Sequence, residues 1–200
     1  MNDDQFRELM YQALQTEQGG IAVYETAIKC AVNDDLREEW ETYLDETRHH
    51  EEVVLGVFQS LGLDPDAETP GRAVVRFIGE SLVAAMEMAL ASGPPEAAEL
   101  VAGECVVHAE TKDHLNWSLI STLVEDRKGA SGETRDALAA ACEEVGDDED
   151  EHLYHSKGWT RELWIESLGM KAVLPPPEEQ KNVTTAIGAS RAEQARDDMK

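Results

Sequence analysis

The sequence predicts an all-α protein: a four-helix bundle with a long helical crossover between its second and third long helices. Three observations lead to this fold class. Ala, Glu, Leu and Met are common, and these residues favour helices. Apolar residues recur at helical spacing through most of the chain, and no alternating strand pattern competes with them. Turn-forming residues divide the chain into five helical segments, of which four are long.

Loop signals set the limits of these segments. The NDD run at 33–35 ends one helical pattern and caps the next. The stretch LGLDPDAETPG (61–71) contains two prolines, SGPP (92–95) offers prolines for a helix start, and RKGASGE (127–133) forms a third loop. We therefore expect helices at about 4–31, 34–62, 71–91, 96–126 and 132–168.

The short third segment and the end of the chain complete the domain organisation. Segment 71–91 is strongly apolar and lies between the second and third long helices, where a bundle with two oppositely ordered helical pairs needs a crossover. After Gly169, the run LPPPEEQ (174–180) cannot continue a helix. We therefore expect a helical bundle over residues 1–172 and a flexible, Pro-rich C-terminal tail over 173–200.

The charge and the cysteine content exclude several classes of protein. The net charge of −25 leaves no basic face for nucleic acid and disfavours anionic membranes, whereas an acidic surface concentrates cations. No apolar stretch reaches membrane-spanning length without a charge, and the acidic start MNDDQFREL lacks the apolar region of a signal peptide. Cys30, Cys105 and Cys142 form no CxxC pair, so reduced thiols in a cytoplasmic protein are expected.

Several polar residues fall on the apolar stripes that an advance of about 100° per residue defines. Glu17 lies in the middle of the stripe of the first helix. In the third long helix, Glu104 and His108 fall on the stripe, whereas Glu110 and His114 fall well to its side. We therefore expect Glu17, Glu104 and His108 to face the interior of the bundle.

The acidic stretch DEDEHLYH (148–155) of the last helix divides between the two faces of that helix. Glu149 and His152 straddle the centre of the stripe and lie three residues apart, so both side chains are expected on the buried side. Asp150 and Glu151 point away from it and are expected in solvent.

The second helix offers a similar pair of ligands. His50 lies on the apolar stripe and Glu46 lies at its edge, four residues earlier. The alternative pair of Glu46 and His49 is aimed less well, because His49 points away from the stripe.

Each long helix thus places a carboxylate on or beside its apolar stripe, and no Lys or Arg shares these stripes. Isolated buried carboxylates are costly, so cations, hydrogen bonds or protonation must compensate them. Glutamates and histidines around one axis suit two divalent first-row metal ions. The candidate ligands are Glu17, Glu46, His50, Glu104, His108, Glu149 and His152. His108 is alternatively a core histidine. Tyr24, two turns after Glu17, either bonds a ligand carboxylate as a candidate catalytic residue or packs.

The pattern resembles the ferritin-like superfamily over about residues 4–168, through the crossover, Tyr24 and six of these ligands: Glu17, Glu46, His50, Glu104, Glu149 and His152. The segment YLDETRHHEEVVLGVFQSLGLDP (43–65) is similar to the second helix of small bacterial ferritin-like stress proteins. The resemblance implies a dinuclear carboxylate site for iron or manganese, with iron favoured, that reacts with O₂ or peroxide. In ferritins and rubrerythrins the second-helix Glu and His lie three residues apart, whereas Thr47 occupies that position relative to His50. Either Glu46 or His108 then completes the site.

Two kinds of function follow from this pattern. The first is an oxidoreductase that oxidises Fe²⁺ or reduces peroxide at a dinuclear metal site, of the ferroxidase or rubrerythrin type. The second is a non-enzymatic stress or scaffold module, in which the tail docks into a larger assembly through Val183, Ala186 and Ile187. Four tryptophans and the apolar crossover favour a homo-oligomer, a dimer or higher.

Overall fold

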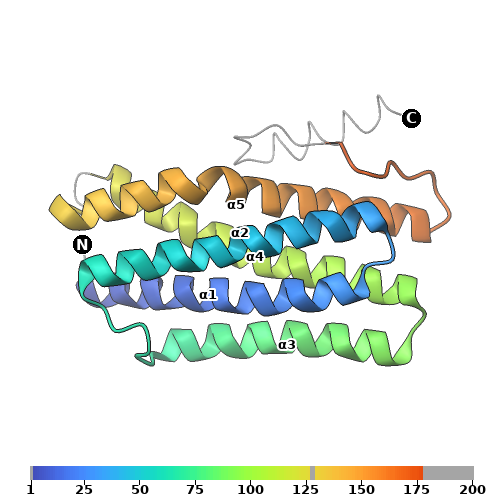
Figure 1. The fold of residues 1–200 in the computed structure, drawn as a ribbon, viewed down its shortest axis with the longest axis horizontal. Coiled ribbons are helices and arrows are strands. Elements are labelled where there is room, and N and C mark those ends of the chain that lie inside the picture. The colour runs from blue at the N-terminus through green and yellow to red at the C-terminus, as the bar shows by residue number, and fades with distance from the viewer. Residues whose placement is uncertain (1, 127–128, 178–200) are drawn as a thin grey trace.

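The computed structural model describes residues 2–126 and 129–177, and this part of the chain forms helices, turns and loops without any strand (Figure 1). The helices are α1 (Asp3–Cys30), α2 (Asp34–Leu61), α3 (Pro70–Ser92), α4 (Pro95–Glu125) and α5 (Gly132–Ser167). The expected all-α class is confirmed, and each expected helix limit lies within one residue of the observed limit.

Polar caps explain where the helices begin and end. The side chains of Asn2, Asn33 and Thr69 accept hydrogen bonds from backbone N–H groups in the first turns of α1, α2 and α3, respectively. Gly62 ends α2 in the left-handed conformation, with φ of 63°, which a residue without a Cβ adopts at little cost.

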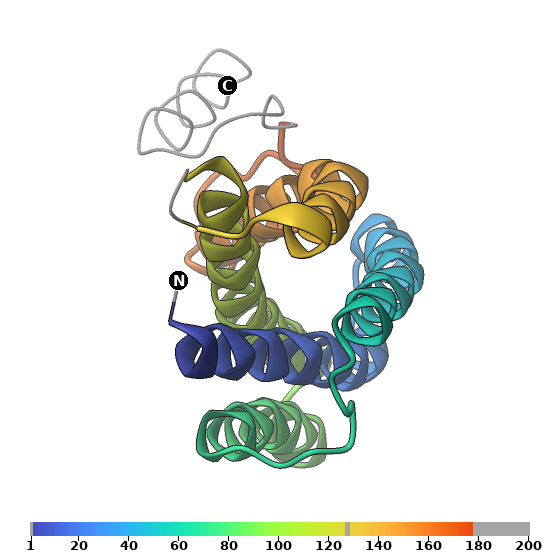
Figure 2. The ribbon, with the colours of Figure 1, turned by 90° about the vertical axis from the view of Figure 1, so that its left-hand side faces the viewer.

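Four helices form a ring and the fifth lies outside it (Figure 2). The helices α1 and α2 form one antiparallel pair, and α4 and α5 form the other (Figure 1). Helix α3 packs on the outer side of α1 and α4 and returns the chain to the end at which α2 began. It approaches α1 closely where two glycines meet, because a Cβ on Gly79 would lie only 3.6 Å from Cα of Gly19. The crossover that the sequence predicts is therefore this helix.

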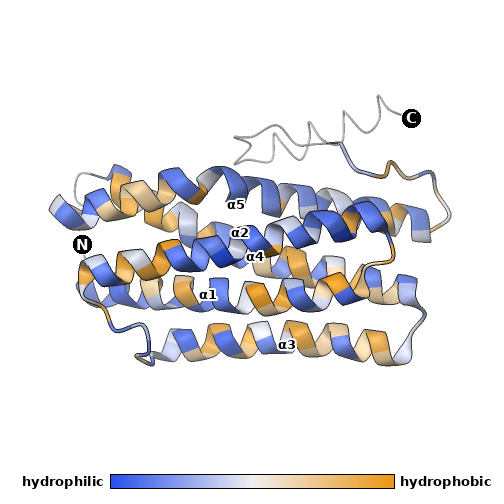
Figure 3. Ribbon diagram, viewed as in Figure 1, coloured by the Kyte–Doolittle hydropathy of each residue, from blue (hydrophilic) through white to orange (hydrophobic). Residues whose placement is uncertain are grey.

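The apolar core of the ring is divided into two clusters. One contains Tyr24, Trp40 and Val106. The other contains Leu14 and Ile120, towards the opposite end of the bundle. In each ring helix, polar residues lie in sequence between the residues of the two clusters. Hydrophilic residues are correspondingly frequent along α2 and α5 (Figure 3). The division leaves a polar layer across the middle of the bundle.

The outer face of α3 is apolar and open to solvent. Val74, Phe77, Ile78 and Met88 are exposed, with 70% exposure for both Phe77 and Met88. None of the helices described here combines the length and the apolar character that a membrane crossing requires.

The chain folds back along α5 after Gly169 (Figure 1). The backbone N–H of Val173 donates a hydrogen bond to Oε2 of buried Glu162 over 2.8 Å. Pro176 is buried against Gly158, where an added Cβ would lie 3.2 Å from the proline ring. The first residues of the expected tail thus contact the bundle, whereas Val183, Ala186 and Ile187 lie outside the described residues.

Candidate metal centre

Six buried carboxylate and imidazole side chains lie in the layer between the two apolar clusters, and together they form what we call the carboxylate–histidine cluster. All four ring helices contribute to it, and each of the six residues is at most 5% exposed. The members are Glu17 of α1, His50 of α2, Glu110 and Asp113 of α4, and Glu149 and His152 of α5. Within the described part of the chain, the ion pairs of these residues join carboxylates to histidines and involve no Lys or Arg.

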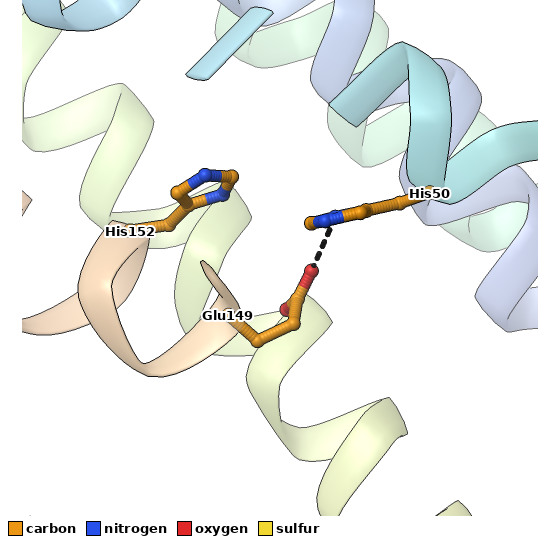
Figure 4. A group of neighbouring side chains, drawn as sticks. All are labelled: His50, Glu149 and His152. Carbon is orange, nitrogen blue, oxygen red and sulfur yellow. Dashed lines mark ion pairs between the residues drawn. The ribbon is translucent and has the colours of Figure 1, made fainter. Parts of the chain in front are cut away.

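Glu149 and the two histidines form the first group of potential metal ligands. One ligand atom each from His50, Glu149 and His152 lies within 4.8 Å of the other two. The carboxylate of Glu149 points across from α5 to the imidazole of His50, with 2.9 Å between Oε1 and Nδ1 (Figure 4). His152 lies one turn after Glu149, so the helix presents both side chains to the same side.

Glu149 also belongs to a second group, with Glu17 and Asp113. Here too, one carboxylate oxygen from each residue lies within 4.8 Å of the others. Trp117, one turn after Asp113 on α4, donates a hydrogen bond from Nε1 to Oε1 of Glu17 over 2.9 Å. The two groups therefore share Glu149 and occupy adjacent places in the bundle.

Glu110 joins the cluster through Tyr24 and His152. The hydroxyl of Tyr24 donates a hydrogen bond to Oε1 of Glu110 over 2.9 Å, and Oε2 of Glu110 lies 3.8 Å from Nδ1 of His152. Of the two alternatives for Tyr24, the structure therefore gives the hydrogen bond to a buried carboxylate.

Two further carboxylates contact the histidines from the rim of the cluster. Oε2 of Glu46, whose side chain is 35% exposed, lies 2.8 Å from Nε2 of His152. Oδ2 of Asp148 lies 3.4 Å from Nε2 of His50. A carboxylate behind a ligating imidazole fixes the orientation of its ring, so both residues are placed to position the histidines.

Several atoms of the cluster have no hydrogen-bond partner although they are buried. They are Oε2 of Glu17, Nδ1 of His50, Oε2 of Glu110, Oδ1 of Asp113 and Oε2 of Glu149. Nδ1 of His50 is close to Glu149 but does not meet it in hydrogen-bonding geometry. Buried polar atoms are nearly always satisfied, and oxygen and nitrogen atoms that converge from four helices are suitable ligands for cations. The residues present therefore fit a metal centre.

Burial and mutual repulsion shift the ionisation of the carboxylates. Burial, followed by the charge of Asp113, raises the pKa of both Glu17 and Glu149 well above the usual value. Burial and the charge of Glu110 raise the pKa of Asp113 to about 8. Without a cation, the raised pKa values therefore favour the protonated forms of these acids, whereas a bound divalent ion would favour their ionised forms.

The two histidines respond to their surroundings in opposite directions. Burial and the neighbouring His152 lower the pKa of His50 to about 4, so its imidazole is neutral and free to ligate a metal. Burial acts in the same direction on His152, but the hydrogen bond that its imidazole donates to Glu46 and the charge of Glu110 outweigh it and raise the pKa of His152.

The structure brings together four of the expected ligands: Glu17, His50, Glu149 and His152. Glu46 lies at their rim.

The expectation that Glu104 and His108 face the interior is wrong, because both are exposed. Glu104 accepts a hydrogen bond from Trp164 Nε1 at the surface. His108 lines a cavity between α1, α3 and α4. Helix α4 contacts three other helices, so apolar residues surround much of it and do not define a single inward face.

Glu110 and Asp113 are the members of the cluster that the sequence analysis missed. They lie three residues apart on α4, the same spacing as Glu149 and His152 on α5, and Trp117 follows one turn later. That spacing beside a buried aromatic residue was the available signal. Asp150, expected in solvent, is instead half-buried between α4 and α5.

Comparison with family models, with curated proteins and with solved structures finds no match to this chain. The resemblance to the ferritin-like superfamily therefore stays a prediction. The fold and the cluster define the class of protein by themselves: a helical bundle whose buried carboxylates and histidines can hold a metal ion.

Proposed function

We propose that this chain is a dinuclear metal protein whose two divalent cations would be held by the two ligand groups that share Glu149. One ion would be held by His50 and His152 and the other by Glu17 and Asp113. The observation that supports this proposal most directly is that Glu149 belongs to both ligand groups and has an oxygen without a hydrogen-bond partner.

The formal charges of the cluster support two ions. Its four buried carboxylates carry −4 when ionised, and two divalent cations supply about +4. Mixed carboxylate and imidazole ligands suit first-row transition metals, whereas Mg²⁺ and Ca²⁺ prefer oxygen alone. We therefore propose iron or manganese, with iron favoured.

The proposed activity is the oxidation of Fe²⁺ by O₂, or the reduction of peroxide with electrons from Fe²⁺. Bound metal ions would supply the redox chemistry. The protein would hold them in a buried site, and the hydroxyl of Tyr24 would orient the carboxylate of Glu110 beside them through the hydrogen bond that it donates. Burial, followed by the charge of Glu110, raises the pKa of Tyr24 well above its usual value, so the hydroxyl keeps its proton and remains a donor to Glu110.

Metal content provides the test. Protein purified without chelators and loaded anaerobically with Fe²⁺ or Mn²⁺ is expected to contain about two ions per chain. Anomalous scattering from crystals at the iron and manganese edges should place both ions beside Glu149. Glu149→Gln should fall below about one ion per chain, whereas Glu104→Gln, which alters an exposed residue of α4, should bind as the wild type does. Less than about a tenth of an equivalent in the loaded wild type would contradict the proposal.

A second candidate is a metal-free scaffold, and the raised pKa values of the buried acids support it. The upward shifts favour the neutral acid forms of Glu17, Asp113 and Glu149, and neutral acids need no cation. Unchanged thermal unfolding of the wild type in the presence of Fe²⁺ and Mn²⁺ would favour this alternative. The homo-oligomer and the docking role of the tail stay predictions.

A further inference from the structure

A cavity of about 430 Å³ between α4 and α5 extends from the surface to the carboxylate–histidine cluster. Its walls come from both helices, with His114, Trp117 and Ser118 on α4 and Gly146, Glu149 and Asp150 on α5. Glu149 is only 2% exposed, so the cavity reaches a residue that bulk solvent hardly contacts.

Small residues keep this cavity open. A Cβ added to Gly146 would meet no atom within 4 Å, and Ser118 and Ser121 line the opposite wall. Trp117 forms a further part of the wall, and its indole donates the hydrogen bond to Glu17. The cavity thus contacts both ligand groups of the cluster, one directly and one through the indole.

The outer part of the cavity carries groups that attract cations. Nε2 of His114 lies 2.8 Å from Oδ1 of Asp150, and the two side chains are 20% and 17% exposed, respectively. Glu125 is exposed at the same cavity. A cleft lined with negative charge raises the local concentration of cations, and the whole chain carries a net charge of −25.

The inner part of the cavity ends at an acceptor without a partner. Oε2 of Glu149 is buried and makes no hydrogen bond. Carboxylate and imidazole groups therefore follow one another from Asp150 and His114 inward to Glu149. The groove between α2 and α5 differs, since its lining includes His49, Gly56 and Glu144 but none of the six cluster residues.

We propose that the cavity between α4 and α5 is the route by which divalent cations reach the centre, with Asp150 and His114 as the first ligands and Glu149 as the receiving ligand. This inference rests on the proposed metal centre. It assigns a role in uptake to residues that lie outside both ligand groups.

Blocking the cavity tests the route. Gly146→Leu fills the open space beside Glu149, and Gly56→Leu is its matched control, because Gly56 also lies in a helix, has no neighbouring atom within 4 Å of an added Cβ and lines the other groove. Uptake of Co²⁺ would be followed by stopped-flow absorption and tryptophan quenching, and the final Co²⁺ content by elemental analysis. Gly146→Leu is expected to slow uptake about tenfold or more at unchanged final content, and Gly56→Leu to match the wild type.

A change of charge tests the outer ligands without altering the shape of the cavity. Asp150→Asn is expected to slow Co²⁺ uptake several-fold at low ionic strength and less at high salt, whereas Asp136→Asn, an exposed aspartate of the same helix, should have no effect. Equal uptake rates for Gly146→Leu and Gly56→Leu would overturn the route. A wild-type chain that binds no Co²⁺ at equilibrium would instead overturn the metal centre itself.

Discussion

The indole of Trp117 and the carboxylate of Glu17 connect α4 to α1 by a buried hydrogen bond of 2.9 Å. Trp117→Phe would keep most of the aromatic packing and remove the donor, which leaves one more buried oxygen without a partner. We expect the free energy of unfolding of the metal-free protein to fall by about 1–3 kcal/mol. Urea denaturation followed by circular dichroism measures this change.

Trp164 provides the control for that measurement, because it donates a comparable hydrogen bond of 3.0 Å to Glu104 at the surface. Trp164→Phe is expected to cost less than about 1 kcal/mol, since water replaces the lost donor. An equal fall in the free energy of unfolding in the two variants would contradict the prediction that the buried hydrogen bond contributes more than the exposed one.

The metal-free protein should lose stability as the pH rises. Burial and the charge of Glu110 raise the pKa of folded Asp113 to about 8, from about 3.8 when it is unfolded, so the folded chain retains a proton that the unfolded chain releases. The stabilisation is complete below the lower value and disappears as the pH approaches the upper one. Unfolding in urea with a chelator between pH 5 and 9 is expected to show this decline.

Asp113→Asn removes the titrating group while preserving its shape, so it should make the pH dependence of stability shallower, whereas exposed Asp136→Asn should leave it unchanged. The affinity of the wild type for metal ions should depend on pH in the opposite direction to the stability of the metal-free protein. Ligand carboxylates must release their protons before they bind a cation, so binding strengthens as the pH rises. Stability that increases with pH in the presence of chelator would contradict the assignment.

Divalent ions should stabilise the fold. A ligand that binds only the folded state at about 100 times its Kd adds about 2.7 kcal/mol to the free energy of unfolding. We expect thermal unfolding of the wild type to move to higher temperature with Mn²⁺ or anaerobic Fe²⁺, and EDTA to reverse the shift. Glu17→Gln should lose most of it, and Glu104→Gln should retain it. A shift of the same size in both variants would place the binding elsewhere.

Tyr24 is expected to affect the reaction rather than metal binding. Tyr24→Phe removes the hydroxyl that donates to Glu110 over 2.9 Å. We expect unchanged metal content but oxidation of Fe²⁺, followed by absorbance, that is about tenfold slower or more, because Glu110 loses the hydrogen bond that orients it. Tyr11→Phe removes a comparable hydroxyl, which bonds the carbonyl of Asp64 at the end of the bundle, and it should react as the wild type does.

Contact between α4 and α5 depends on the absence of a side chain at Gly103. A Cβ there would lie 2.8 Å from Oγ1 of Thr160, whose hydroxyl already donates to the carbonyl of Ser156. Gly103→Ala is therefore expected to destabilise the protein by about 1–3 kcal/mol. Gly146→Ala lies in open space on the partner helix and should stabilise it by up to about 1 kcal/mol, because alanine favours a helix more than glycine does. Thermal unfolding of both variants gives the comparison.

The sequence predicted the helices well because caps and breaks are local signals. The polar residues at Asn2 and Asn33 and the glycine at Gly62 specify their helix ends through contacts within a few residues. The crossover was predictable for the same reason, since the prolines on both sides of segment 71–91 isolate it.

The centre was predictable in part, and the difference lies in how many neighbours each helix has. Glu149 and His152 could be assigned because the buried face of α5 is limited to the side that meets α4 and α2. Helix α4 also packs against α3, so apolar residues lie on most sides of α4. Their periodicity therefore led to Glu104 as the inward carboxylate, where the structure has Glu110. Which face is inward on such a helix depends on contacts distant in sequence, and periodicity does not report them.

The polar layer between the two apolar clusters also has a consequence for the fold itself. If α1 slid along its neighbours by one turn, about 5.4 Å, Glu17 would enter surroundings like those of Leu14 or Gly20 and lose its polar neighbours. The same displacement of α5 would take Glu149 away from His50. We therefore expect the layer to set the axial register of the four ring helices. Substitution of all its residues at once by apolar residues would then give a more stable bundle in which the helices align in several registers.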